Sequence, residues 1–150
     1  MLSNILSIEK SVNICYDFET IQRIDKYFIN QMTDFREIKE WEKAHELTVA
    51  VYQATQEFQE VEILGLTQQI RLACSAIPIK IAQGYDREDY EEKINYFELA
   101  SDNATEVQYF LLLSYELQML PIEDYDRLVS KAVEVREAID KLITKFNNKF

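Results

Sequence analysis

The fragment Glu42-x-x-His45 is the arrangement in this sequence most suited to chemistry, because that spacing places a carboxylate and an imidazole on one face of a helix. Di-metal sites in helical bundles need such a motif from each of two helices, together with glutamates from the other two. His45 is the only histidine in the chain, so a single chain cannot complete the set. The sequence therefore predicts no metal site, and it predicts a partly buried, hydrogen-bonded His45.

The two cysteines, Cys15 and Cys74, do not form a cluster with the spacing of metal ligands. A Cys–His nucleophile would require one of them beside His45, together with a third group that orients the imidazole. We instead expect two reduced thiols, with Cys74 a small core residue. The sequence also lacks a glycine-rich phosphate loop, a Walker motif and a GxSxG motif. We therefore predict no catalytic residues, no cofactor and no enzymatic activity.

Composition narrows the class of fold. The 150 residues suit one domain, and only two glycines and two prolines argue against an all-β fold with its frequent turns. A net charge of −11 argues against a general nucleic-acid binder. The amino-terminal residues lack a basic segment followed by an apolar run, and no apolar stretch reaches 18 residues. We expect a cytoplasmic protein that does not span a membrane.

Apolar residues at steps of three and four predict four long helices, at about residues 34–58, 66–83, 88–119 and 123–146. Asp34 and Glu37 resemble a capping box that starts the first helix, and Gly84 is the expected left-handed stop of the second. The expected inner face of the first helix comprises Phe35, Ile38, Trp41, His45, Thr48 and Tyr52. That of the second comprises Ile70, Ala73, Ile77, Ile81 and Gly84. That of the third comprises Tyr90, Ile94, Phe97, Ser101, Ala104, Gln108, Leu111 and Tyr115. That of the fourth comprises Leu128, Ala132, Val135, Ile139, Leu142 and Phe146.

The predicted fold is therefore all-α, an antiparallel up-down four-helix bundle at residues 32–150. Residues 1–31 form a separate amino-terminal extension with weaker patterning. Within it, Ile21, Ile24 and Phe28 have helical spacing and predict a short helix from Asp17 to Asn30.

Pro78 lies inside the second predicted helix. It has no N–H to donate, and its ring crowds the carbonyl of Cys74, which costs about 3 kcal/mol in a helix interior. The proline is tolerable where a bend improves the packing of the helix on its neighbours. The alternative is that the bend shapes a surface for self-association or for a partner.

The same segment carries a resemblance to a known family. The residues concerned are Gly65-Leu66-Thr67, Gln69-Ile70-Arg71, Ala73, Ile77-Pro78, Ile81-Ala82 and Gly84, preceded by Trp41, Ala44, His45 and Leu47 of the opening DFREIKEWEKAHEL. From about Phe35 to Phe146 the chain resembles the bacterial four-helix-bundle family encoded by intervening sequences within 23S rRNA genes.

The resemblance implies a left-handed up-down bundle that assembles as a ring, commonly a pentamer, with no established activity for most members. A related branch is the accessory variability determinant of diversity-generating retroelements, a basic bundle oligomer that binds the reverse transcriptase and nucleic acid. The composition independently favours self-association. One Trp, nine Tyr and eight Phe give a thin bundle more apolar surface than one narrow core hides.

Two functions remain open. The first is an oligomeric scaffold whose acidic exterior binds a basic protein, and the acidic run from Asp86 to Glu92 is either a docking face or a solvated helix start. The second is direct RNA binding, as an rRNA-associated or reverse-transcriptase accessory protein. Residues 32–150 carry 13 Lys or Arg against 23 Asp or Glu, which opposes RNA and favours the scaffold. RNA binding would require a local basic patch of Arg71, Lys80, Arg87 and Lys93.

Overall fold

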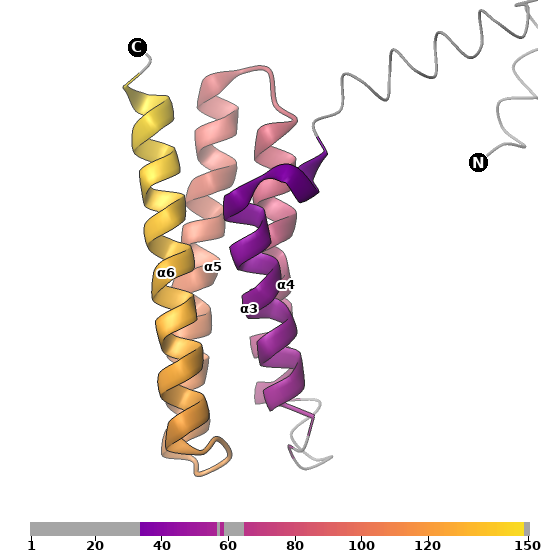
Figure 1. The fold of residues 1–150 in the computed structure, drawn as a ribbon, viewed down its shortest axis with the longest axis vertical. Coiled ribbons are helices and arrows are strands. Elements are labelled where there is room, and N and C mark those ends of the chain that lie inside the picture. Colours follow the sequence, from indigo (N-terminus) through magenta and orange to yellow (C-terminus); the bar gives the residue numbers. More distant parts are fainter. Residues whose placement is uncertain (1–33, 57, 59–64, 149–150) are drawn as a thin grey trace, which may run out of the picture. The chain divides into compact units, whose positions relative to one another are not determined.

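The computed structural model describes residues 34–56, 58 and 65–148 (Figure 1). They form a short 3-10 helix, η1 (Phe35–Glu37), and four α-helices: α3 (Lys39–Ala54), α4 (Leu66–Tyr85), α5 (Tyr90–Glu116) and α6 (Ile122–Asn147). No strand occurs among these residues, so the prediction of an all-α fold is confirmed. The predicted extension at 1–31 and its helix at Asp17–Asn30 lie outside the described residues.

Successive helices run in opposite directions along the bundle (Figure 1). Helix α3 packs on α4 and α6, and α5 packs on the same two helices, so the four surround one core. The predicted up-down four-helix bundle is therefore confirmed. The short links α4–α5 and α5–α6 leave antiparallel packing of neighbours as the simplest arrangement.

The core residues repeat every seven positions. On α5 the buried set is Phe97, Ala100, Ala104, Val107, Leu111 and Ser114. The predicted inner face of this helix is therefore only partly right, because Tyr90 and Tyr115 are exposed. On α6 the buried set is Leu128, Ala132, Val135, Ile139, Leu142 and Phe146, which is the predicted face. A strict seven-residue repeat keeps its seam facing the neighbour only if the helices wind around each other with a left hand.

The predicted first helix is wrong at both ends. It is interrupted at Ile38, whose backbone is extended (φ −85°, ψ 116°) and whose side chain is buried. The capping box does not form, because the carboxylate of Asp34 accepts hydrogen bonds from the backbone N–H of Arg36 at 3.0 Å and from its guanidinium at 2.7 Å. Helix α3 then ends at Ala54 instead of near Phe58.

The predicted inner face of the first helix is only partly right: Ile38 is buried, Trp41 and Thr48 are half-buried, and the other three residues are exposed. Helix α3 buries Ala44, Leu47, Ala50 and Val51. His45 and Tyr52 are exposed, and Phe35 in η1 is 44% exposed. Helix α3 thus faces the core with two alanines and two aliphatic side chains, whereas the ring of Tyr52 lies outside the core.

Gly84 does not stop α4. The helix continues to Tyr85, and no glycine in the described part of the chain has a positive φ. Its role is close packing, since a Cβ atom at this position would lie 2.6 Å from Cε1 of Phe97 on α5. The left-handed residue is instead Gln118 (φ 58°), just after α5, which ends earlier than predicted. Its N–H bonds the carbonyl of Tyr115, and the next N–H bonds that of Ser114, which is a Schellman ending.

Pro78 is buried within an otherwise continuous α4. The carbonyl of Cys74, which Pro78 cannot pair, lies 3.0 Å from the hydroxyl of Thr48 on α3. The same hydroxyl is 2.8 Å from the carbonyl of Ala44 within its own helix. The structure thus supports the packing explanation, because the hydrogen-bonding group freed by the proline is satisfied by the neighbouring helix.

Candidate interaction surfaces

The Glu42–His45 fragment lies on the exposed side of α3. The imidazole of His45 stacks on the ring of Trp41, with centroids 4.8 Å apart and an interplanar angle of 11°. The ring centroid of Phe35 lies 4.9 Å from that of Trp41. The prediction that His45 is partly buried is therefore wrong. No group of three or more His, Cys, Asp and Glu in the described ranges could hold a metal ion.

Cys74 is fully buried on α4, as predicted. Burial raises the pKa of its thiol to about 11, and the nearby hydroxyl of Thr48, 3.6 Å from Sγ, offsets only part of that shift. A thiol reacts as its thiolate, so Cys74 has the environment of an inert structural cysteine.

We expect native Cys74 to react about 100-fold more slowly with a thiol reagent at pH 8 than the unfolded chain, because its pKa of about 11 replaces an ordinary 9.0. A Cys15→Ser background isolates this thiol. The raised pKa also makes the free energy of unfolding fall at alkaline pH. The neutral thiol contributes its full stabilisation below about pH 9, and this stabilisation is lost as the pH rises toward 11. Urea titrations from pH 7 to 10.5 measure this loss, which Cys74→Ala should reduce. Immediate stoichiometric labelling of the native protein would contradict the assignment.

Arg71 makes contacts within the bundle. Its Nε donates a hydrogen bond to Oγ1 of Thr55 at 2.8 Å, and its guanidinium lies 4.8 Å from the ring centroid of Tyr52. These contacts connect the end of α3 to the start of α4. Arg71 precedes Lys80 by nine residues in the same helix, which is about 13 Å along the axis.

The other three candidate cations lie near the α4–α5 link. The guanidinium of Arg87 and the ammonium of Lys80 both lie over the ring of Tyr96, at 4.8 and 5.5 Å from its centroid. The ammonium of Lys93 donates to the carbonyl of Tyr85 at 3.0 Å. The structure therefore brings Lys80 and Arg87 together around one ring and leaves Arg71 apart.

Lysines and glutamates in nearly equal numbers line the surface where α3 and α6 meet. A groove of about 350 Å³ between these helices is lined by Lys39, Glu40, Lys43, Glu134, Glu137, Ala138 and Lys141. Lys43 pairs with Glu134 at 3.7 Å, and Lys131 pairs with Glu46 at 3.4 Å. Because these pairs are exposed, each contributes little to stability.

The outer side of α4 and α5 is different, because large apolar side chains are exposed there. Leu72 and Ile79 on α4 are 61% and 52% exposed, and Leu99 and Tyr109 on α5 are 47% and 59% exposed. A shallow groove of about 470 Å³ between the helices is lined by Gln69, Leu72, Ala73, Asn103, Glu106 and Phe110.

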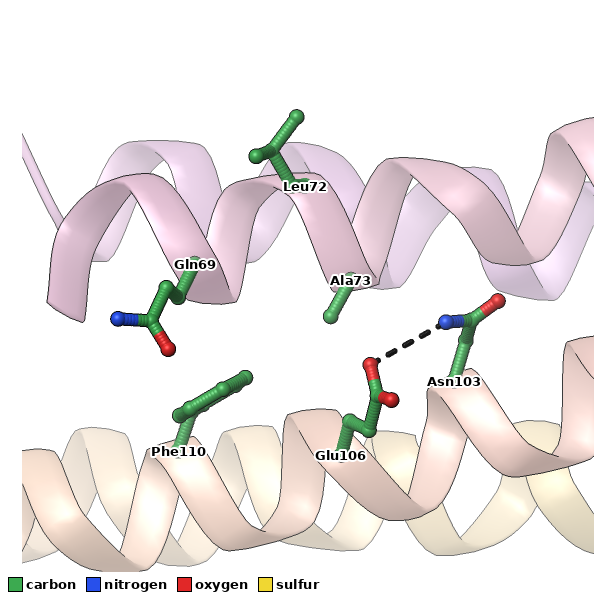
Figure 2. A pocket seen from close by; sticks show the side chains of 6 residues that line it. All are labelled: Gln69, Leu72, Ala73, Asn103, Glu106 and Phe110. Atoms are coloured by element: carbon green, nitrogen blue, oxygen red, sulfur yellow. Dashed lines mark hydrogen bonds between the residues drawn. The ribbon is translucent and has the colours of Figure 1, made fainter. Parts of the chain in front are cut away.

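Figure 2 shows the side chains of this groove. Phe110 and Gln69 point into the space between α4 and α5, while Leu72 points away from α5. The amide of Asn103 donates to the carboxylate of Glu106 at 3.3 Å. Reasoning from the sequence missed this surface. The available signal was the complete absence of Asp and Glu between Leu66 and Tyr85.

Most of the resemblance residues are structural. Ile70, Ala73, Ile77, Pro78, Ile81 and Gly84 are buried, Ala82 and Trp41 are half-buried, and Gly65 occupies the N-cap position of α4. The predicted inner stripe of α4 is thereby confirmed.

The fold defines an all-α protein of the up-down four-helix-bundle class. The family model for 23S rRNA-intervening sequence proteins matches residues 36–141, and the chain belongs to that family. A crystal structure of a protein of unknown function from the S23 ribosomal protein family of Bacteroides thetaiotaomicron has the same fold. Its TM-score is 0.64 at 19% identity, covering 69% of this chain and 97% of that one.

No curated protein matches the chain significantly. None of the helices in the described ranges combines the length and the apolar character needed to cross a bilayer.

Proposed function

We propose that this chain is a non-enzymatic cytoplasmic scaffold that forms a homo-oligomeric ring, most simply of five copies, and docks a basic protein partner. The observation that carries the proposal is the arrangement of charge at the α4–α5 link. Carboxylates project into solvent there, while the cations between them are held against the protein.

Five acidic residues at the link and in the first turn of α5 are exposed: Asp86, Glu88, Asp89, Glu91 and Glu92. The two cations in the same stretch, Arg87 and Lys93, are half-buried and lie over aromatic rings. A ring of subunits repeats this acidic segment once per copy, and the resulting field attracts a basic partner over about a Debye length.

RNA is the alternative ligand, and the pairing of Lys80 and Arg87 around Tyr96 is the observation that favours it. A guanidinium on an aromatic ring can stack on a base. The neighbouring carboxylates of Asp86 and Glu88 would repel the phosphates of the same strand. The basic protein is therefore the preferred partner.

Fluorescence anisotropy with the full chain distinguishes the two ligands. The probes are a labelled peptide rich in Lys and Arg and a labelled single-stranded RNA, each about twenty units long, titrated at several salt concentrations. We expect the peptide to bind, with an affinity that falls as salt rises, and the RNA to bind at least about tenfold more weakly. Tighter binding of the RNA would overturn the scaffold assignment.

A matched pair of variants locates the surface. Neutralising the acidic segment with Asp86→Asn, Glu88→Gln, Glu91→Gln and Glu92→Gln should weaken peptide binding about tenfold or more, and it leaves Asp89 in place as the cap of α5. The control removes the same charge elsewhere, with Glu42→Gln, Glu123→Gln, Asp126→Asn and Glu137→Gln. Equal losses in both variants would show that net charge alone attracts the peptide.

A further inference from the structure

Helix α4 has a second stripe on the side opposite its core. The residues Gln68, Leu72, Ser75, Ile79 and Ala82 follow one another at steps of four and three. The two largest apolar members, Leu72 and Ile79, are more than half exposed. A helix on the surface of a bundle normally carries one apolar stripe, so a second one indicates packing on both sides.

The charge around this stripe is positive. Helix α4 contains no Asp or Glu, and its two charged residues are Arg71 and Lys80. The chain as a whole has 27 acidic against 16 basic residues. The outer stripe of α4 is thus apolar and has no carboxylate on its own helix, and it is flanked by two half-buried cations, Arg71 over Tyr52 and Lys80 over Tyr96.

Helix α5 has an outward stripe of the same spacing and opposite charge. Its members are Asn95, Leu99, Asp102, Glu106, Tyr109, Leu113 and Glu116. Leu99 and Tyr109 provide exposed apolar area, and Asp102 and Glu106 are exposed carboxylates. Over its length, α5 carries six acidic residues and a single lysine.

We propose that these two stripes are the two halves of one self-association interface, in which α4 of one copy packs on α5 of the next. The inference rests on the self-association part of the proposed function and names the surfaces that perform it. Apolar side chains meet along the seam, and the cations of α4 face the carboxylates of α5. Complementary charge fixes the orientation and excludes alternatives.

Symmetric pairing of like stripes is disfavoured. Packing α4 on α4 would place the cations Arg71 and Lys80 of both copies in one interface. Packing α5 on α5 would do the same with Asp102 and Glu106. Like charges brought together in this way repel each other, so the contact joins unlike faces.

Unlike faces lead to a ring. Helices α4 and α5 are neighbours in the bundle, so the two contact surfaces lie on adjacent sides of each copy (Figure 1). Each added copy therefore turns relative to the previous one. A contact between unlike faces closes into a ring where the rotation brings the last copy back to the first, and otherwise continues as a helical filament.

The test uses one variant for each face of the full chain. Ile79→Glu places a negative charge against the carboxylates of α5, and Tyr109→Lys places a positive charge against the cations of α4. Light scattering after size-exclusion chromatography should show each variant shifted toward the 17.8 kDa monomer, with self-association weakened at least about tenfold. Both positions are exposed, and circular dichroism checks that the fold is retained.

A one-to-one mixture of the two variants is decisive. It should reassociate to at least twice the monomer mass, because the Ile79→Glu copy retains its α5 face and the Tyr109→Lys copy retains its α4 face. A symmetric interface would be blocked by only one of the two substitutions, and mixing would not restore it. That result would overturn the proposal.

Val133→Glu on α6 is the matched control, since Val133 is 40% exposed on a helix that contributes to neither proposed face. It should leave the assembly unchanged, and dissociation by this variant would move the interface away from α4 and α5. A monomeric wild type at micromolar concentration would remove self-association altogether. An oligomeric wild type whose size survives both Ile79→Glu and Tyr109→Lys would overturn only the assignment of the faces.

Discussion

Replacing Gly84 by valine is expected to lower the free energy of unfolding by about 3 kcal/mol, at the upper end of overpacking costs. A Cβ atom at Gly84 would lie 2.6 Å from Cε1 and 3.0 Å from Cδ1 of Phe97. Phe97 has no room to retract, because it is fully buried and packs against the rings of Tyr85 and Phe146. Urea denaturation followed by circular dichroism measures the loss.

The control is Gln83→Val, which adds the same β-branched side chain at the adjacent, half-buried position of α4. Its expected cost is below about 1 kcal/mol, the size of a propensity effect. A double substitution tests the cause directly. If close approach explains the glycine, Gly84→Ala and Phe97→Leu together should cost less than the sum of the single changes. Strict additivity of the two costs would rule this explanation out.

Thr48→Val is expected to cost about 2 kcal/mol, because it leaves the buried carbonyl of Cys74 without a hydrogen-bond donor. Val and Thr have nearly the same shape, so the change removes the hydroxyl with little effect on packing. In a Pro78→Ala background the new N–H at position 78 can pair with this carbonyl. Thr48→Val should then cost about 1 kcal/mol less, which a double-mutant cycle measures.

Thr144→Val on α6 is the matched control for this cycle. Its hydroxyl also bonds the carbonyl four residues earlier, that of Asp140 at 2.9 Å, but in an exposed position. We expect an effect within about 0.5 kcal/mol there. An equal cost of Thr48→Val with and without Pro78 would show that the threonine does not compensate for the proline.

Where one stripe dominates a helix, its buried face followed from the sequence. The six core positions of α6 were predicted in full, because most of the remaining positions are charged or polar and leave one dominant apolar seam. Helix α3 has no such contrast. Its alanines and its two large rings, Trp41 and Tyr52, all occur at helical spacing, and periodicity favoured the rings. The core instead receives Ala44, Leu47, Ala50 and Val51.

For the candidate surfaces, too, the sequence predicted one part and the tertiary structure decided the rest. The acidic run from Asp86 to Glu92 was visible in the sequence as a charge pattern. That Arg87 turns onto Tyr96, and leaves the carboxylates exposed, depends on a ring from the next helix. The second stripe of α4 was equally present in the sequence. Only the packing of α3 and α5 shows which of its two stripes is inside.

By itself, the sequence determined the helical class, the four long helices of the described bundle, the order in which they follow and the excess of negative charge. These depend on periodicity, turn residues and composition, which are local properties of the chain. Tertiary structure alone decided why Gly84 is a glycine, what compensates for Pro78 and which apolar residues face solvent. Each of these depends on an atom from another helix: Cε1 of Phe97, the hydroxyl of Thr48, or the neighbour that covers one side of α4. Contacts between residues distant in sequence are set by packing, and periodicity carries no information about them.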